Sequence, residues 1–148
     1  MGLILEAQGK PAEARQTYEK IVARSPEAAV ASNNLAWLLA EQGADLDAAL
    51  QLAQAAQRVS PDSPQVSDTL GWVYYKKEIP TLAVRSFEAS VKADPNEPLF
   101  RYHLALAHMQ GGNASKARTE LDVALKLKPG YPEAVKARQT LEAAVKAP

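Results

Sequence analysis

The chain has 148 residues, of which 47 % are hydrophobic and 23 % charged, a composition close to that of ordinary globular proteins and unlike that of disordered segments. Seventeen lysines and arginines balance seventeen aspartates and glutamates, so no basic excess is present to attract nucleic acid, and we expect none as a partner. The absence of cysteine excludes disulfides and thiolate metal sites, and no apolar stretch approaches the roughly 20 residues that cross a bilayer, so we expect no membrane insertion.

Proline and alanine divide the chain into short helices. The sequence contains 10 prolines and 28 alanines, and because proline disrupts helix interiors that alanine favours, the prolines must lie between helices. Successive spacings of 35, 34 and 34 residues separate Pro26, Pro61, Pro95 and Pro129. A fixed period of this size predicts a repeat architecture. We therefore expect repeats at about 1–28, 29–63, 64–97 and 98–131 within a single domain that spans 1–148.

Each repeat is predicted to contain two helices. In chain order, full helices are expected at about 11–24, 29–42, 46–59, 64–77, 80–93, 98–111 and 114–127. In the third repeat, Ser63 can cap a helix that begins at Pro64, and Pro80 begins the next one. That second helix is expected to end before a turn at 94–96. No segment alternates with a period of two residues, so we expect no β-strand.

Small residues recur where the two helices of a repeat would cross. One column contains Gly2, Ala36, Gly71 and Ala105, and another contains Ala14, Ala49, Ala83 and Ala117. Two antiparallel helices approach closely only where side chains are small. Gly71 is therefore predicted to face the helix of Ala83, with Leu70 and Phe87 beside the crossing. A further column, at the turn between the helices, contains Gly9, Gly43 and Gly112 but is interrupted by Glu78.

At these positions the sequence resembles the tetratricopeptide repeat family, whose motif is a helix–turn–helix of 34 residues. The third repeat carries the resemblance in Leu70, Gly71, Tyr74, Ala83, Phe87 and Pro95. The matching residues of the second repeat are Leu35, Ala36, Leu39, Gly43, Ala49, Ala56 and Pro61, and those of the fourth are Leu104, Ala105, Gly112, Ala117, Leu121, Ala124 and Pro129. Ala53 and His108 depart from the pattern. The resemblance implies an all-α fold, a right-handed superhelical solenoid of antiparallel helix pairs.

The two ends of the chain differ. Residues 132–146 are predicted to form a capping helix, whose apolar face comprises Ala134, Ala137, Leu141, Ala144 and Val145. At the beginning, Gly2 aligns with Gly71, so the first helix is only partly present. We expect the chain to be a fragment of a longer protein. The alternative is a homo-oligomer in which Leu3, Ile4 and Leu5 pair with a second copy.

The resemblance also implies a binding surface, because proteins of the family bind peptides or partner helices in a concave groove lined by the first helix of each pair. On these helices a stripe lies about 200° from the packing face of Leu70. The candidate groove residues are Asn33, Asn34, Trp37, Asp68, Trp72, Tyr75, Tyr102, Leu106 and Met109. Aromatic and methionine side chains are typical of adaptable peptide-binding surfaces. The alternative is that Trp37 and Trp72 only fill the seam between repeats.

More specific chemistry finds little support in the residues. Some domains of this family hold the terminal carboxylate of chaperone tails with lysine, arginine and asparagine. The matching columns contain no lysine or arginine, and comprise Asn33, Trp37, Thr69, Leu99 and His103. His103 and His108 are five residues apart and so lie on different faces of one helix, which argues against a shared metal. We expect no enzyme, no cofactor and no metal site.

The sequence therefore predicts a protein–protein interaction module, a scaffold or adaptor that binds a peptide or a partner helix. The segments 33–39, 68–72 and 101–104 also resemble the C-terminal part of bacterial tetratricopeptide proteins of envelope and exopolysaccharide systems. Two alternatives remain open. One is a regulatory solenoid attached to a catalytic domain, and the other is a self-associating scaffold in a bacterial envelope assembly system. Both a cytoplasmic and a periplasmic location fit the composition.

Overall fold

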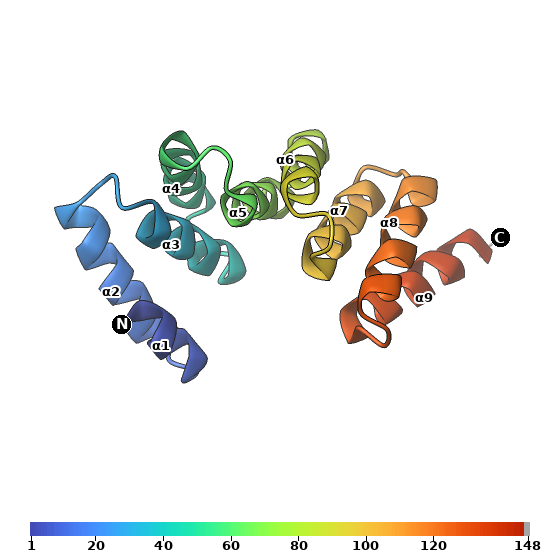
Figure 1. Cartoon of the computed structure of the whole chain (residues 1–148), viewed down its shortest axis with the longest axis horizontal. Coiled ribbons are helices and arrows are strands. Elements are labelled where there is room, and N and C mark those ends of the chain that lie inside the picture. Colours follow the sequence, from blue (N-terminus) through green and yellow to red (C-terminus); the bar gives the residue numbers. More distant parts are fainter. Residues whose placement is uncertain (147–148) are drawn as a thin grey trace.

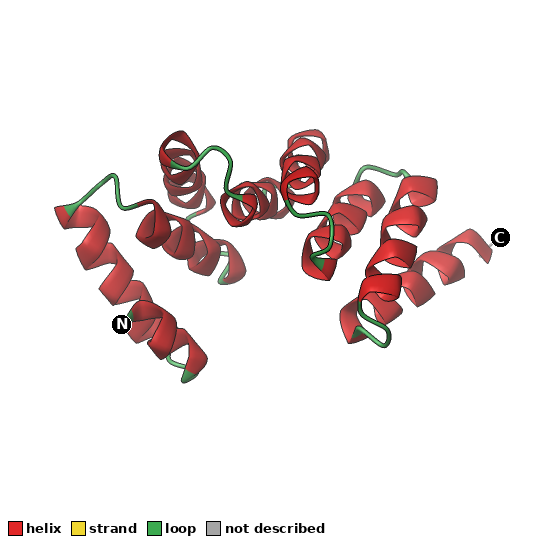
Figure 2. Ribbon diagram, viewed as in Figure 1, coloured by secondary structure: helices red, strands yellow, loops and turns green. Residues whose placement is uncertain are grey.

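The computed structural model describes residues 1–146, and their regular secondary structure is entirely helical (Figure 2). The helices are α1 (Gly2–Ala7), α2 (Pro11–Arg24), α3 (Ala29–Glu41), α4 (Leu46–Val59), α5 (Pro64–Lys76), α6 (Pro80–Ala93), α7 (Pro98–Gln110), α8 (Ala114–Leu127) and α9 (Pro132–Lys146). The predicted helices agree with these bounds to within one residue. The expectation of an all-α fold is thereby confirmed for the described residues.

The helix pairs follow one another along an arch (Figure 1). Helices α3, α5 and α7 lie on its inner side, and α4, α6 and α8 lie on its outer side. Each inner helix packs against the outer helix that follows it, and neighbouring inner helices also touch, α3 with α5 and α5 with α7. The result is a solenoid, in which each repeat contacts mainly its neighbours along the chain.

Prolines and polar side chains fix where the helices begin. Proline lies in the first turn of α2, α5, α6 and α7, where its missing N–H has no helical partner to lose. The side chain of Ser63 accepts a hydrogen bond from the backbone N–H of Val66, which confirms the predicted cap of α5. Asp45 and Asn113 cap α4 and α8 in the same way, accepting from Ala48 and Lys116.

Helices cross closely where the sequence has glycine or alanine. A Cβ atom placed on Gly71 would lie 2.6 Å from Cδ1 of Phe87, and one placed on Gly2 would overlap the ring of Tyr18. Phe87 is completely buried in this crossing, so the predicted contact between the helix of Gly71 and the helix of Phe87 is confirmed. Ala36 and Ala105 occupy the same column and are also completely buried.

The turn between inner and outer helix keeps one conformation whether or not glycine is present. Gly9, Gly43 and Gly112 adopt φ angles of 70°, 58° and 78°. Glu78 occupies the same place with φ of 59°, a left-handed conformation that is strained for a residue with a side chain. The packing of α5 against α6 therefore imposes the turn on Glu78.

Helix α9 packs its apolar face against the last repeat. Ala134, Ala137 and Leu141 are buried in one cluster with Leu121 of α8 and with Tyr131, which immediately precedes α9. Of the other residues predicted on this face, Ala144 is exposed because it lies beyond Leu141, the last α9 residue of the cluster. The side chain of Val145 lies outside the described residues.

Candidate partner-binding face

Aromatic side chains from three inner helices meet around Trp72. We call the group formed by Trp37, Trp72, Tyr75 and Tyr102 the aromatic face. The rings of Trp37 on α3 and Trp72 on α5 stack with their centroids 5.4 Å apart. Tyr75, one turn further along α5, also stacks with Trp72, with the ring centroids 5.1 Å apart. All four side chains are half-buried, so each contributes both to packing and to the surface.

The indole of Trp72 makes a hydrogen bond through its nitrogen and a cation–π contact through the face of its ring. Its Nε1–H donates to Oε1 of Glu41 at the end of α3, at 2.7 Å. The ammonium of Lys76 lies 5.2 Å from the ring centroid, a cation–π arrangement, and 3.8 Å from the Glu41 carboxylate. Glu41 and Lys76 therefore neutralise each other at this edge, and the indole is fixed in one orientation.

A buried contact between a carboxylate and an imidazole lies under the aromatic face. Nδ1 of His103 on α7 is 2.9 Å from Oδ1 and 3.0 Å from Oδ2 of Asp68 on α5. Asp68 is only 4 % exposed and His103 only 3 %, and burial raises the pKa of Asp68 while the bond to His103 opposes this rise. The ring of His103 also packs 4.6 Å from Trp72 and 5.7 Å from Tyr102. His103 thus supports the aromatic face from below.

The aromatic contacts continue toward the C-terminal helix. Tyr102 lies 5.6 Å from Tyr131, whose ring is covered by the ammonium of Lys128 at 4.7 Å. Burial, followed by the nearby charge of Glu133, raises the pKa of Tyr131 to about 12 and also raises that of Tyr102. The line of rings therefore runs from α3 to the start of α9.

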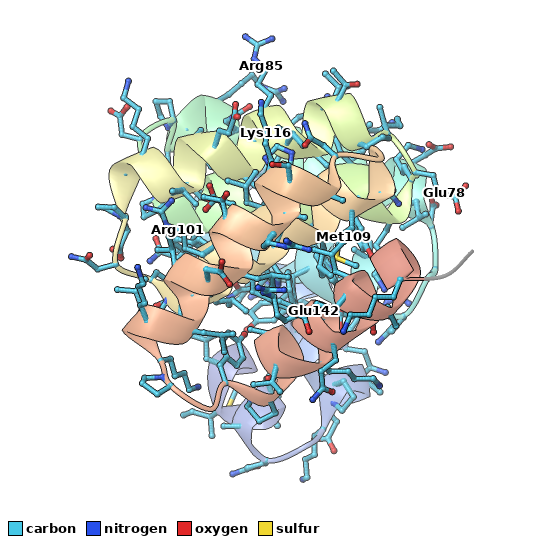
Figure 3. All side chains as sticks on the ribbon, turned by 90° about the vertical axis from the view of Figure 1, so that its right-hand side faces the viewer. Glu78, Arg85, Arg101, Met109, Lys116 and Glu142 are labelled. Carbon is cyan, nitrogen blue, oxygen red and sulfur yellow. The ribbon has the colours of Figure 1, made fainter. Side chains whose placement is uncertain are left out.

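The predicted groove residues do not all reach this surface. Asp68 lies beneath it, because its carboxylate is used by His103. Met109 is half-buried and packs, like Tyr102, against the cluster shared by α7, α8 and α9, and Figure 3 shows it beside α9. Leu106 is half-buried on α7.

The two asparagines belong to the N-terminal side of the molecule. Asn33 donates to Oδ1 of Asn34 at 3.3 Å, and Asn34 donates to the hydroxyl of Tyr18 at 3.2 Å. The Tyr18 hydroxyl in turn donates to Glu6 at 2.5 Å. Oδ1 of Asn33 is buried and has no hydrogen-bond partner among the described residues. Asn34 thus serves an internal hydrogen-bond chain rather than the aromatic face.

Sequence reasoning missed the residues that act between repeats. His103 has no carboxylate one turn away on its own helix, and its partner Asp68 lies 35 residues earlier in the chain. That separation is one repeat plus one residue, a signal that was available in the sequence. Glu41, which accepts the hydrogen bond from Trp72, lies 31 residues before it, a separation that does not match the repeat period.

The described residues offer no group of three or more histidine, aspartate or glutamate side chains placed to hold a metal ion. Within this part of the chain there is also no helix long and apolar enough to cross a membrane. His108 is buried on α7, where burial and the nearby charge of Lys116 lower its pKa.

Known proteins share both the sequence pattern and the fold. The tetratricopeptide repeat pattern matches residues 1–64 and 69–132. A TPR repeat-containing protein of Pseudomonas aeruginosa is 28 % identical over 75 residues, which are 51 % of this chain and 13 % of that protein. The chain therefore spans a small part of the length of this relative.

Two solved structures show the same arrangement of helices. MamA from Desulfovibrio magneticus RS-1 superimposes with a TM-score of 0.80 at 20 % identity, covering 97 % of this chain and 81 % of that one. YrrB, described as a TPR protein with an unusual peptide-binding site, gives 0.73 at 19 % identity, covering 97 % and 74 %. Because the repeat pattern covers most of the sequence and the helices form the same solenoid, the chain belongs to the tetratricopeptide repeat family.

Proposed function

We propose that this chain is a protein-interaction module that binds a peptide or a partner helix across the aromatic face. The observation that carries the proposal is the preorganised arrangement of Trp37, Trp72, Tyr75 and Tyr102, whose half-buried rings come from three inner helices. Aromatic side chains that are already held in place lose little conformational freedom on binding and form the energetic centres of many interfaces. The peptide-binding site named for the similar YrrB structure agrees with this use of the fold.

The charges around the aromatic face indicate the chemistry of the partner. Glu41 and Lys76 neutralise each other beside Trp72, and Asp68 is used by His103. The face therefore offers rings with little net charge. We expect it to bind an apolar or aromatic segment. The affinity should change little between low and physiological salt, because the binding would not depend on an attraction between opposite charges that salt could screen.

Tryptophan fluorescence gives a direct test, since both tryptophans of the chain lie on the aromatic face. Peptides would be selected from a random displayed library on the intact chain and then titrated against it. We expect binding to change the tryptophan emission and to weaken at least about tenfold in Tyr102→Ala, as expected for removal of a central aromatic contact.

Arg85→Ala is the matched control, because Arg85 projects from the outer side of the arch (Figure 3). Circular dichroism melting would verify that every variant is folded at the temperature of the titration. Selected peptides that bind wild type, Tyr102→Ala and Trp37→Ala with equal affinity would place binding on another surface and contradict the proposal.

A further inference from the structure

A pocket of about 370 Å³ lies between the outer helices α6 and α8, with the inner helix α7 beneath it. Its apolar part is formed by Val91 of α6 and Leu104 of α7, both of which are buried. His108 of α7 also lines the pocket, with only 6 % of its surface exposed. No residue of the aromatic face contributes to this lining, so the site does not depend on the function proposed for that face.

The imidazole of His108 differs from that of His103, which is held by Asp68. No hydrogen bond or ion pair joins the ring nitrogens of His108 to another described residue. A neutral imidazole carries one N–H donor and one acceptor nitrogen, and burying such groups without a partner is costly. The ring of His108 therefore has hydrogen-bonding capacity that is available only to what enters the pocket.

The third repeat shows that this pocket departs from the repeat pattern. The equivalent hollow there lies beside Tyr74 and has a volume of about 250 Å³. The hydroxyl of Tyr74 accepts a hydrogen bond from Gln54 of α4 at 3.4 Å. The residues 34 positions later are His108 and Glu88. Because an imidazole is shorter than a phenol, the pocket is larger here and no such bond joins Glu88 to His108.

Two lysines line the same pocket. Lys116 of α8, labelled in Figure 3, stands where the third repeat has the apolar Leu82. Burial and then the charge of Lys116 hold the pKa of His108 below its usual value, which places this ammonium close to the imidazole. Lys92 of α6 is the second lysine, and no ion pair within the described chain holds either of them.

The acidic side chains of the pocket do not cancel this charge. Glu120 is already bound by Arg101 at 2.9 Å. Glu88 is the other carboxylate of the lining, and it stands alone against the two lysines. The pocket therefore has a positive balance and offers more hydrogen-bond donors than free acceptors, a combination that favours an anion.

We propose that this pocket binds a carboxylate carried on a short aliphatic stem. The carboxylate accepts a hydrogen bond from the N–H of His108 and is attracted by Lys116 and Lys92, while the stem packs on Val91 and Leu104. A free aliphatic acid and a glutamate side chain of a protein partner share this chemistry. The volume of the pocket lies at the lower end of the range of small-molecule sites, which suits a group of this size.

An NMR titration with butyrate, at constant ionic strength, tests the assignment on the intact chain. His108 is one of only two histidines, so its imidazole signals are readily followed. We expect a saturable shift of these signals, and binding at least about tenfold weaker for the neutral analogue butyramide. The pKa of His108 should rise in the complex, because the carboxylate stabilises the protonated ring.

Substitutions at the rim separate this site from unspecific attraction to lysines. Lys116→Ala should weaken butyrate binding at least about fivefold, and Glu88→Gln should strengthen it because a repelling charge is removed. Lys126→Ala is the matched control, since Lys126 is exposed on the same helix but does not line the pocket. Circular dichroism melting verifies that each variant is folded.

The double variant His108→Tyr/Glu88→Gln gives the fourth repeat the residues that the third repeat has at these two positions. It should abolish butyrate binding without lowering the melting temperature, because the tyrosine fills the pocket as Tyr74 does in its own repeat.

A blocked tripeptide with glutamate between two alanines distinguishes the two sources of the carboxylate. Tighter binding of this peptide than of butyrate assigns the ligand to a protein partner, and equal or weaker binding assigns it to a free acid; both results support the site. The proposal is overturned if butyrate gives no saturable shift up to about 50 mM, the result expected of a pocket that holds only water. Equal binding of butyrate and butyramide, or equal effects of Lys116→Ala and Lys126→Ala, would also overturn it.

Discussion

Asp68 and His103 join two neighbouring repeats through a buried contact of 2.9 Å directly under Trp72. The carboxylate belongs to α5 and the imidazole to α7, so the bond fixes how one inner helix lies against the next. Trp72 packs on the same imidazole and also stacks on Trp37 of the preceding repeat. The orientation of the aromatic face therefore depends on a polar pair that is buried beneath it.

Asp68→Ala should lower the free energy of unfolding by about 2–4 kcal/mol, because it leaves the ring nitrogen of His103 buried without a partner. Urea denaturation followed by tryptophan fluorescence measures this loss. Asp68→Asn keeps an oxygen at the same place and should cost less than half as much. Equal losses in the two variants would show that the hydrogen bond to His103 is not the cause.

Gly71→Ala should destabilise the protein by about 1–2 kcal/mol even though alanine is the better helix former. The added Cβ would lie 2.6 Å from Cδ1 of the completely buried Phe87 ring, and overpacking of this kind costs about 1–3 kcal/mol against a gain of up to about 1 kcal/mol from helix propensity. Phe87→Leu should lower the free energy of unfolding less in the Gly71→Ala background than in the wild-type background, because the smaller side chain relieves the overlap. Additive losses in chemical denaturation would contradict the close contact.

Glu78→Gly should raise the free energy of unfolding by about 0.5–1 kcal/mol. Glu78 is held at φ of 59°, where glycine has no steric penalty. Gly112→Ala is the reciprocal control, since Gly112 has φ of 78° and a Cβ there would meet nothing within 4 Å, so backbone strain is the only change. Opposite shifts of the melting temperature are expected, and a stabilised Gly112→Ala would refute the explanation.

The protein should lose stability in alkali partly through Tyr18. Burial and the hydrogen bond to Glu6 raise the pKa of Tyr18 from 10.0 to about 12, so the unfolded chain releases this proton first. Its stabilising contribution is complete below pH 10 and is lost as the pH rises toward 12, at no more than about 1.4 kcal/mol per pH unit.

Denaturation at pH 9, 10 and 11 measures this loss. Tyr18→Phe should start from lower stability but fall less steeply above pH 10, because the titrating group has been removed. Parallel pH profiles for the two proteins would exclude Tyr18 as a source of the alkaline instability.

The repeat organisation was predictable because it follows from local chemistry. The spacing of the prolines fixed the ends of the helices, and Ser63 marked the beginning of α5. The columns of small residues placed Gly71 against the helix of Ala83 with Phe87 beside the crossing, and all three residues lie in one repeat. These contacts are short in sequence and recur with the motif, which makes them readable without any knowledge of how the repeats are stacked.

The candidate site was predictable only in its outline. The stripe of candidate residues contains Trp37, Trp72, Tyr75 and Tyr102, and the structure brings rings of these residues together on the inner helices. Helical spacing could not show that Asp68, in the same stripe, would be buried. A carboxylate on a helix surface becomes internal when the next helix covers it, and that covering depends on the angle between repeats.

By itself, the sequence determined the helices, their pairing within each repeat and the columns of small residues at which they cross. Only the tertiary structure decided the contacts between repeats, including the pairing of Asp68 with His103, the bond from Trp72 to Glu41 and the pocket beside His108. The physical reason is that helix formation and hairpin packing depend on residues close in the chain. The rotation of one repeat on the next is set by the summed packing of many side chains.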